Sequence, residues 1–375
     1  MFKRVLLAAA VAAAVSAPAF AEVSISGSAE MDFFARTNNG DGTKDAAGND
    51  NTTTKFLQEI AIVVNVDGKD KLDNGSTLSW RLAQKVATDW RFDSFGAREA
   101  WIAYGGDWGS LKFGNQWSNT YLIQDWPYAS KGFSGTMGEP GYTGFGSGIS
   151  YTSPSFGGFN LQAAYDFGNG NKDAPTAYEV TLQGAIGPVN LDMGYFAVED
   201  GAPVSHGGSK GNNLTGERKI GTDAVTGKDI MESLKGGKFS NWIIGARGSI
   251  ADVAIRAAVR NITSEVGTAG KNVKADQMGY LLSGTYGFGK NALSLGYMHQ
   301  TAEKDGESHS DNDFDTIGFQ WDYSLSKNTG AFLQIRHNMV GKNWADNEAA
   351  WQNADGKAGS KDNSTRILVG TWTGF

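Results

Sequence analysis

Charged side chains at alternating positions of short stretches are the groups that could do chemistry in this chain of 375 residues. Arg81 and Lys85 share one such stretch, and Arg256 and Arg260 share another. Residues an even number of positions apart on a β-strand point to the same face, so each pair is expected to present two positive charges on one surface. Fixed charges attract or repel ions without forming a bond. The chemistry that this pattern indicates is electrostatic.

The sequence offers little for covalent or metal chemistry. It has four histidines and no cysteine, which excludes disulfides and thiolate sites. Neither a His-Glu-x-x-His zinc motif nor a Walker phosphate-binding loop is present. We therefore expect no catalysis, no cofactor and no metal site. The acidic loops at 38–51 and 305–315 could hold a divalent cation through carboxylates, although they lack EF-hand spacing.

The first 21 residues are typical of a secretory signal peptide. Lys3 and Arg4 form a basic start, residues 5–15 form an apolar run, and Ala19 and Ala21 frame a cleavage site. The remaining chain, 22–375, contains no apolar run long enough for a transmembrane helix and is interpreted as one domain. The formal net charge of −7 gives no reason to expect nucleic acid as a partner.

Alternation of apolar and polar residues dominates the rest of the chain. In one segment Val253, Ile255 and Val259 share a parity opposite to that of Arg256 and Arg260. A period of two is typical of a strand with one apolar and one polar face. About sixteen such strands can be marked, each near the length of about ten residues that a tilted strand needs to cross a bilayer. They lie near 22–36, 54–69, 76–88, 96–105, 110–117, 147–154, 158–167, 177–187, 189–199, 241–250, 253–265, 277–287, 291–304, 313–325, 329–340 and 363–375.

The connections between these strands alternate between short and long. Residues 37–53 form a long link, residues 70–75 form a short one, and the rhythm continues to the long loop at 341–362. Such alternation collects the tight turns at one end of the sheet and the loops at the other. It predicts an all-β fold, a closed transmembrane antiparallel β-barrel. The third long loop, 118–146, is rich in glycine and aromatic residues, and we expect it to fold inward and constrict the lumen.

Several stretches carry a family resemblance. They are 22–27 (EVSISG), the block from 98–101 (REAW) to 109–114 (GSLKFG), 150–159 (SYTSPSFGGF) and the terminal Phe375. These stretches resemble the general porins of Gram-negative bacteria, of the Neisseria, Comamonas and Rhodobacter kind. The resemblance implies a homotrimer in the outer membrane, in contact with lipid and lipopolysaccharide, with short periplasmic turns and long external loops. It also implies passive diffusion of small hydrophilic solutes and ions.

The sequence also departs from that family. Asn115 stands where the family usually has arginine, just before the inserted loop, and Leu57-Gln58-Glu59-Ile60 replaces an Arg-x-Gly-Phe pattern. The pore charges of the family therefore cannot be transferred as a set.

Strand parity and the resemblance together identify a candidate pore constriction. Its predicted basic wall is Arg81, Lys85, Arg98 and Lys112. The opposing acids, from the inserted loop, are Asp125 and Glu139. Because basic and acidic candidates nearly balance, the sequence does not predict the ion preference, and any one charge could instead form a salt bridge in the wall. Further inward-facing candidates are Glu30, Asp32, Glu59, Glu179, Asp192, Arg247, Arg256, Arg260, Asp322, Arg336 and Arg366.

Two other functions stay open at the level of sequence. One is a channel selective for sugars or anions, which would need an aromatic track in the lumen, begun by Phe34, Trp126, Tyr128 and Phe332. The other is a structural or adhesive barrel with a plugged lumen, which the long loop at 201–240 would permit. A barrel of about sixteen strands favours an open channel over a plugged one.

Overall fold

The computed structural model describes residues 22–47, 50–87, 91–92, 96–128, 143–166, 176–199, 217–222, 229–233, 238–268, 271–304, 307–308, 313–341 and 363–375. The expected signal peptide, residues 1–21, and the candidate Glu139 lie outside these ranges. Helical structure in the described residues is confined to α2 (Asn119–Ile123) and the π-helical η1 (Gln124–Tyr128). No helix among those residues is long and apolar enough to cross a membrane.

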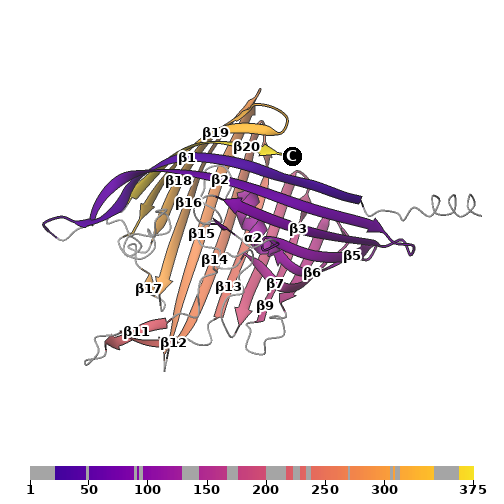
Figure 1. Ribbon diagram of the computed structural model, residues 1–375, viewed down its shortest axis with the longest axis horizontal. Helices are drawn as coiled ribbons and strands as arrows, with labels where there is room; N and C mark the ends of the chain where they lie inside the picture. Colours follow the sequence, from indigo (N-terminus) through magenta and orange to yellow (C-terminus); the bar gives the residue numbers. More distant parts are fainter. Residues whose placement is uncertain are drawn as a thin grey trace, which may run out of the picture.

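Antiparallel pairing closes the strands into one barrel (Figure 1). Eighteen strands of the described chain form one sheet, and two of them, β4 (Arg91–Phe92) and β17 (Glu307–Ser308), are two-residue additions, which leaves sixteen barrel strands. These are β1 (Glu22–Lys44), β2 (Asp50–Lys71), β3 (Thr77–Ala87), β5 (Glu99–Gly106), β6 (Gly109–Trp117), β7 (Gly144–Thr152), β8 (Phe159–Asp166), β9 (Thr176–Ile186), β10 (Val189–Glu199), β13 (Lys238–Ile250), β14 (Val253–Thr268), β15 (Lys271–Phe288), β16 (Asn291–Lys304), β18 (Phe314–Ser324), β19 (Thr329–Val340) and β20 (Asn363–Gly374).

The ring is closed by the first and last strands. β1 pairs with β20 from Ser28 opposite Gly374 to Arg36 opposite Arg366. Beyond that ladder, the backbone N–H of Phe375 donates to Gly27 O at 3.1 Å, and Gly27 N–H donates to Phe375 O at 3.0 Å. The prediction of a closed antiparallel barrel of about sixteen strands is confirmed.

The alternation in the sequence becomes an inner and an outer face. On β15, Leu282 is 60% exposed on the outer face, whereas its neighbours Leu281 and Ser283 are buried inside. In a bilayer the outer face meets hydrocarbon, so apolar side chains there are favourable although they are exposed in the isolated chain. The ladder meanwhile pairs the backbone polar groups, as hydrocarbon requires.

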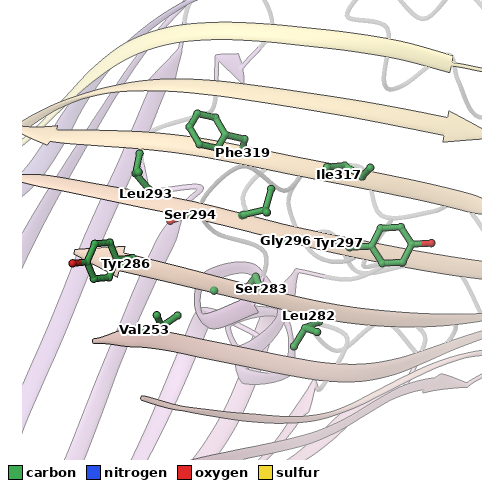
Figure 2. Close-up of a pocket in the computed structure, with 12 residues that line it drawn as sticks. Val253, Leu282, Ser283, Tyr286, Leu293, Ser294, Gly296, Tyr297, Ile317 and Phe319 are labelled. Atoms are coloured by element: carbon green, nitrogen blue, oxygen red, sulfur yellow. The ribbon is translucent and has the colours of Figure 1, made fainter. Parts of the chain in front are cut away.

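A shallow apolar depression marks the outer face of β14, β15, β16 and β18. Figure 2 shows the side chains around it, with Leu282, Leu293 and Ile317 on neighbouring strands. Tyr286 and Tyr297 lie toward its two ends. Tyrosine rings suit the boundary between lipid and water, because the ring is apolar and the hydroxyl is polar. The surface is therefore that of a lipid-facing barrel.

Some regions predicted as loops are strands instead. β1 and β2 continue their pairing to Asn39 opposite Thr53, and β14 and β15 pair as far as Thr268 opposite Lys271. The loop expected between 265 and 277 is thus largely a tight hairpin. Residues there are polar, so the hydrophobic pattern that marked the strands faded while the backbone hydrogen bonds continued. Within the region expected as the long loop 201–240, β11 (Glu217–Thr222) and β12 (Asp229–Ser233) form a separate two-stranded sheet.

Apolar side chains inside the barrel gather in two clusters. One joins Phe145 and Phe196 to Phe239 and Ile262 of the neighbouring wall. The other joins the helical segment to the wall and contains Ile123, Tyr128, Ile243, Ala258, Leu281, Met298 and Phe314. Through Ile123 and Tyr128, this second cluster packs the helical residues 119–128 against the inner wall.

Candidate functional site: the lumen of the barrel

Residues 118–128 leave β6 and fold onto the inner face of the barrel, and we refer to them as the inserted segment. α2 and η1 form most of it, and α2 contacts β9, β10 and β13 (Figure 1). Ser118 caps α2, since its Oγ accepts a hydrogen bond from Tyr121 N–H at 3.1 Å. Thr120 and Ile123 are buried against the wall. Residues 118–128 of the loop predicted at 118–146 therefore lie inside the barrel, whereas residues 144–146 already belong to β7 of the wall.

Glu179 of β9 fixes the start of the inserted segment. Its carboxylate is 1% exposed and accepts hydrogen bonds from Ser118 Oγ at 2.7 Å, Asn119 N–H at 2.8 Å and Thr120 N–H at 3.1 Å. The two backbone donors belong to the first turn of α2, where free N–H groups favour a negative charge. A buried carboxylate is stable there because its charge is matched by three donors. Glu179 is thus an anchor rather than a pore charge.

Tyr128 fixes the end of the inserted segment. Its hydroxyl donates to Asp192 Oδ2 at 2.7 Å. Burial, and then the hydrogen bond to Asp192, raise the pKa of the Tyr128 hydroxyl, which keeps it a donor at neutral pH. Asp192 also accepts from Arg247 Nε at 2.8 Å and from Gln183 Nε2 at 2.7 Å. This one carboxylate therefore ties the segment to β9, β10 and β13.

Two glycines make room for the segment on the wall. A Cβ at Gly245 would lie 2.2 Å from Tyr128 Cζ, and a Cβ at Gly194 would lie 2.9 Å from Thr120 Oγ1. Contacts this short are not tolerated, so any larger residue at Gly245 would push the ring away from the wall. Gln124 adds a hydrogen bond from its Nε2 to Asn241 Oδ1 at 2.8 Å. Glycine, apolar packing and hydrogen bonds together hold the segment in one place.

Arg81 and Lys112, both predicted for the basic wall, come together around Trp101. The Arg81 guanidinium lies 5.9 Å from the ring centroid and Lys112 Nζ lies 5.3 Å from it. Arg81 also binds Asp67 through Nε at 2.7 Å, and its NH1 lies 3.7 Å from Glu99. Since Trp101 Nε1 donates to Glu99 at 2.8 Å, these five side chains form one network on β2, β3, β5 and β6.

The other constriction candidates lie apart from this network or outside the described residues. Arg98 precedes β5, and its guanidinium lies 5.0 Å over the Trp117 ring. Arg98 lies in the bend before β5, where strand parity does not apply, so its assignment to the basic wall stays a prediction. Lys85 has the inward parity of Arg81 on β3, opposite Val63 of β2. Asp125 lies in η1 and is partly buried.

Asp322, an acidic candidate on β18, accepts a hydrogen bond from Gln320 Nε2 at 2.7 Å. The other three acidic candidates stand on neighbouring strands. Asp32 of β1 lies directly opposite Glu59 of β2. Its other neighbour is Gly370 of β20, where a Cβ would lie 2.3 Å from Asp32 Oδ1. Glu30 has the same parity two positions earlier on β1. Among the described residues no group of three metal-ligating side chains has the geometry of a metal site.

Three basic candidates lie on β13 and β14. Arg247 is directly opposite Arg256, and its charge is matched by Asp192. Arg260, four positions from Arg256, is fully buried and donates from NH2 to Gln300 Oε1 at 3.3 Å. Of these three inward-facing candidates, Arg247 thus helps to anchor the inserted segment and Arg260 packs in the wall.

A second set of cations crosses β19, β20, β1 and β2 at one level. Arg336 lies opposite Arg366, Arg366 opposite Arg36, and Arg36 opposite Lys55. We call these four residues the basic row. Their parity is that of the buried Phe34 and Leu368, so they face the lumen, whereas Ile335 and Ile367 face outward.

Comparison with known proteins identifies the fold family. The model of the Gram-negative porin family matches residues 8–343, which is most of the chain. The chain belongs to the Gram-negative porin family. Members of this family are outer-membrane channels rather than enzymes, so the barrel is an outer-membrane β-barrel. The interior groups described above are therefore the lining of a porin.

Individual relatives are distant in sequence. The porin is 25% identical to a chitoporin of Vibrio furnissii over 175 residues, 44% of this chain and only 48% of that protein. It is 22% identical to the major outer membrane protein P.IB of Neisseria sicca over 353 residues, 88% of this chain and 89% of that protein. The match to the chitoporin therefore spans about half of that relative, whereas the match to P.IB spans nearly all of it.

Solved structures share the fold. The anion-selective porin from Comamonas acidovorans superposes with a TM-score of 0.67 at 15% identity, covering 95% of this chain and all of that one. The trimer form of OmpT from Vibrio cholerae superposes with a TM-score of 0.65 at 15% identity, with the same coverage. At these identities the likeness shows the barrel architecture alone.

Several lumen residues of the porin were missed by sequence reasoning. Arg36 and Lys55 fell at or beyond the expected strand ends, although Arg36 has the parity of Asp32. Asp67 shares the parity of Glu59 on β2, so parity alone could have found it. To predict that Glu99 and Trp101 face the lumen, the first residue of β5 must be known. No sequence signal indicated that Glu179 and Asp192 would be anchors for the inserted segment.

Proposed function

We propose that this porin is a passive diffusion channel for small hydrophilic solutes and ions, filtered by size and charge at a constriction. The observation that carries the proposal is the inserted segment, held against the inner wall by Glu179 at one end and Tyr128 at the other. A barrel of sixteen strands is wide enough for a water-filled lumen. A rigid segment mounted inside it narrows that lumen to a fixed size, as a molecular sieve requires.

The charge filter would act where the network around Trp101 faces the inserted segment. Lys112 and Arg81 supply positive charge on β6 and β3, Lys85 adds to it on β3, and Asp125 supplies negative charge from η1. Opposite charges across a narrow polar lumen produce a transverse field that steers charged solutes. Arg98, 5.0 Å over the Trp117 ring, would add a further positive charge to this filter.

We further propose a homotrimer in contact with lipid and lipopolysaccharide. The trimer form of OmpT, which has the same fold, supports the oligomeric state. The apolar outer face supports the contact with lipid, with Leu282 and Leu295 each about three-fifths exposed, at 60% and 61%. Chemical cross-linking of the native protein in detergent tests the trimer, and a species no larger than a monomer would contradict it.

Reconstitution in a planar bilayer tests the channel. Conductance steps that occur in threes, and a reversal potential under a potassium chloride gradient, are the expected results. Lys112→Glu should then move the reversal potential toward cation preference. Lys274→Glu is the matched control, since Lys274 is an exposed residue of β15 paired with Asp276 at 2.8 Å. Folded protein that gives no current would refute the diffusion channel and favour a plugged barrel.

A sugar-selective channel is the second candidate, and it is favoured by the partial match to a chitoporin. Such a channel needs a track of exposed aromatic rings in the lumen. Trp126 of the inserted segment is 76% exposed and fits, but Tyr128 is fully buried and Phe34 is 7% exposed. Liposome swelling with neutral oligosaccharides of increasing length tests it: a smooth decline with size supports general diffusion, and saturation at low concentration supports sugar selectivity.

A further inference from the structure

The apolar depression on the outer face of β14, β15, β16 and β18 lies where one outward side chain is missing. The outward positions of β15 there are Leu282, Gly284 and Tyr286, and glycine leaves the middle position empty. Among the described residues, the only atom within 4 Å of a Cβ at Gly284 would be Val253 Cγ1, at 3.4 Å. The depression has a volume of about 760 Å³, within the range of about 300–1,000 Å³ that is typical of ligand pockets.

One end of the depression lies at the periplasmic boundary of the bilayer. Figure 2 shows Tyr286 and Tyr297 at its two ends. Tyr297 pairs with Leu282, four positions from Tyr286 along β15, so the depression runs along the strands for about 13 Å. Tyr286 stacks on Phe288 at 5.6 Å between ring centroids, directly before the short turn that contains Lys290. Short turns of an outer-membrane barrel face the periplasm.

Exposed lysines lie below the periplasmic end of the depression. Lys290 belongs to the turn between β15 and β16, and Lys327 belongs to the turn between β18 and β19. The two turns are neighbours, because Ser324 N–H donates to Lys290 O at 2.8 Å. The turn between β13 and β14 contributes the one acidic residue of these three turns, Asp252. The local charge is therefore positive, and it favours an anionic headgroup.

The other end of the depression has a different character. Asp315 Oδ1 accepts a hydrogen bond from the Tyr297 hydroxyl and lies 2.8 Å from His299 Nδ1. The ring of His299 stacks on that of Tyr280, with 6.3 Å between centroids. A carboxylate at this end disfavours a phosphate there. The charges thus orient a lipid with its headgroup at the periplasmic end, which selects the periplasmic leaflet over the outer one.

We propose that the depression is a binding site for one anionic phospholipid of the periplasmic leaflet. Its acyl chain fills the place of the missing side chain at Gly284, and its phosphate lies at Lys290 and Lys327. Inside hydrocarbon the acyl chain gains van der Waals contact with a shaped wall, and the lysines supply the headgroup preference. This site rests on the proposed contact of the outer face with lipid, and it does not depend on what crosses the lumen.

Lipid retention by the folded protein in mild detergent tests the site. Native mass spectrometry of the wild type should show one retained phosphatidylglycerol per barrel, held in preference to phosphatidylethanolamine. Gly284→Leu fills the depression and should weaken retention several-fold. Ala163→Leu is the control, since it adds the same bulk on the outer face of β8, between Leu161 and Tyr165. Equal retention in both variants contradicts the site.

The headgroup preference is tested separately. The double variant Lys290→Gln, Lys327→Gln should lose preference for phosphatidylglycerol by about fivefold for each lysine removed. The control is Lys69→Gln, Lys71→Gln, which removes two exposed lysines at the periplasmic end of β2. An unchanged preference in the first double variant refutes the role of the lysines.

Photolabelling of the wild type locates the lipid without any variant. Phosphatidylglycerol with a photoactivatable group in its acyl chain should label residues 282–297 more than the rest of the outer face. Label spread evenly around the barrel refutes the site but leaves the general lipid contact intact, and absence of label refutes that contact as well. Displacement of the label by lipopolysaccharide, or cross-links between two copies at these residues, would assign the depression to those occupants and overturn the proposal.

Discussion

Two walls of the same barrel use arginine in opposite ways. On β10 and β13 the arginine that helps to hold the inserted segment has an acidic partner, since Arg247 Nε meets Asp192 Oδ2 at 2.8 Å. On β19, β20 and β1 the arginines meet each other in register, and Arg336 and Arg366 share the neutral Gln334. The first wall holds the inserted segment in place, and the second places the positive charges of the basic row on the lumen surface. A pore needs both, because a field is useful only when the geometry around it is rigid.

The strongest disturbance should come from the glycine beneath Tyr128. Gly245→Val would place methyl groups where the ring now lies, since a Cβ alone would be 2.2 Å from Tyr128 Cζ. We expect a stability loss of about 3 kcal/mol from overpacking, together with a larger and noisier conductance as the segment leaves the wall. Single-channel recording and thermal unfolding measure both. Gly287→Val is the control, because the nearest atom to its Cβ is 4.0 Å away; equal effects in the two variants would contradict the mounting role.

Arginine removal should have opposite effects on the two walls. Arg247→Gln leaves Asp192 without its ionic partner and should cost about 2 kcal/mol. Arg366→Gln relieves repulsion in the basic row and should stabilise the barrel by about 0.5 kcal/mol. Thermal unfolding of both variants in one detergent and one salt compares them. If both variants lose stability equally, the proposed difference between the two walls is wrong.

Glu179→Gln tests the start of the inserted segment. The variant loses the negative charge that faces two N–H groups of α2 and turns a donor toward them, so a loss of about 2 kcal/mol is expected. Glu199→Gln, an exposed change at the end of β10, is the control and should stay within about 0.5 kcal/mol of the wild type. A variant as stable as this control would show that the segment does not depend on Glu179.

Tyr128→Phe tests the other end of the inserted segment, and its effect on stability should depend on pH. Loss of the hydroxyl should cost about 1 kcal/mol, because Asp192 keeps Arg247 and Gln183 as donors. The pKa of Tyr128 is raised above the ordinary value of about 10. Its contribution is therefore complete below pH 10 and is lost as the pH rises further. The stability difference from wild type should be constant from about pH 6 to 9 and should shrink above about pH 10. Tyr165→Phe is the control, because it removes a tyrosine hydroxyl from the outer face, away from the inserted segment.

The sequence predicted the barrel better than its lumen. Alternation along β14, with Arg256 and Arg260 inward, needs only the two-residue period of a strand, and it held in the structure. Whether strand parity applies to Arg98 depends on where β5 begins, a boundary that periodicity does not define. Glu179 binds the inserted segment through Ser118, which lies 61 positions earlier in the sequence. Such contacts depend on register between distant strands, which no local pattern encodes.

The same limit explains the basic row. Each of its members can be seen to share a parity on its own strand, but their alignment requires knowing that β20 pairs with β1 on one side and β19 on the other. A slip of one residue in either ladder would send Arg366 to the lipid face. Register is thus the information that aligns scattered cations into one row.

Closure of the ring by β20 also sets the order in which the barrel can be made. Asn38 of β1 donates to Asn363 O at 2.7 Å across 325 positions of sequence, so the first strand waits for the last to be synthesised. Until then β1 offers an unpaired edge that other chains can join. Contacts so far apart in sequence form slowly. In hydrocarbon each unpaired backbone group costs several kcal/mol, so an unfinished ring is held outside the bilayer and insertion is coupled to the final pairing step.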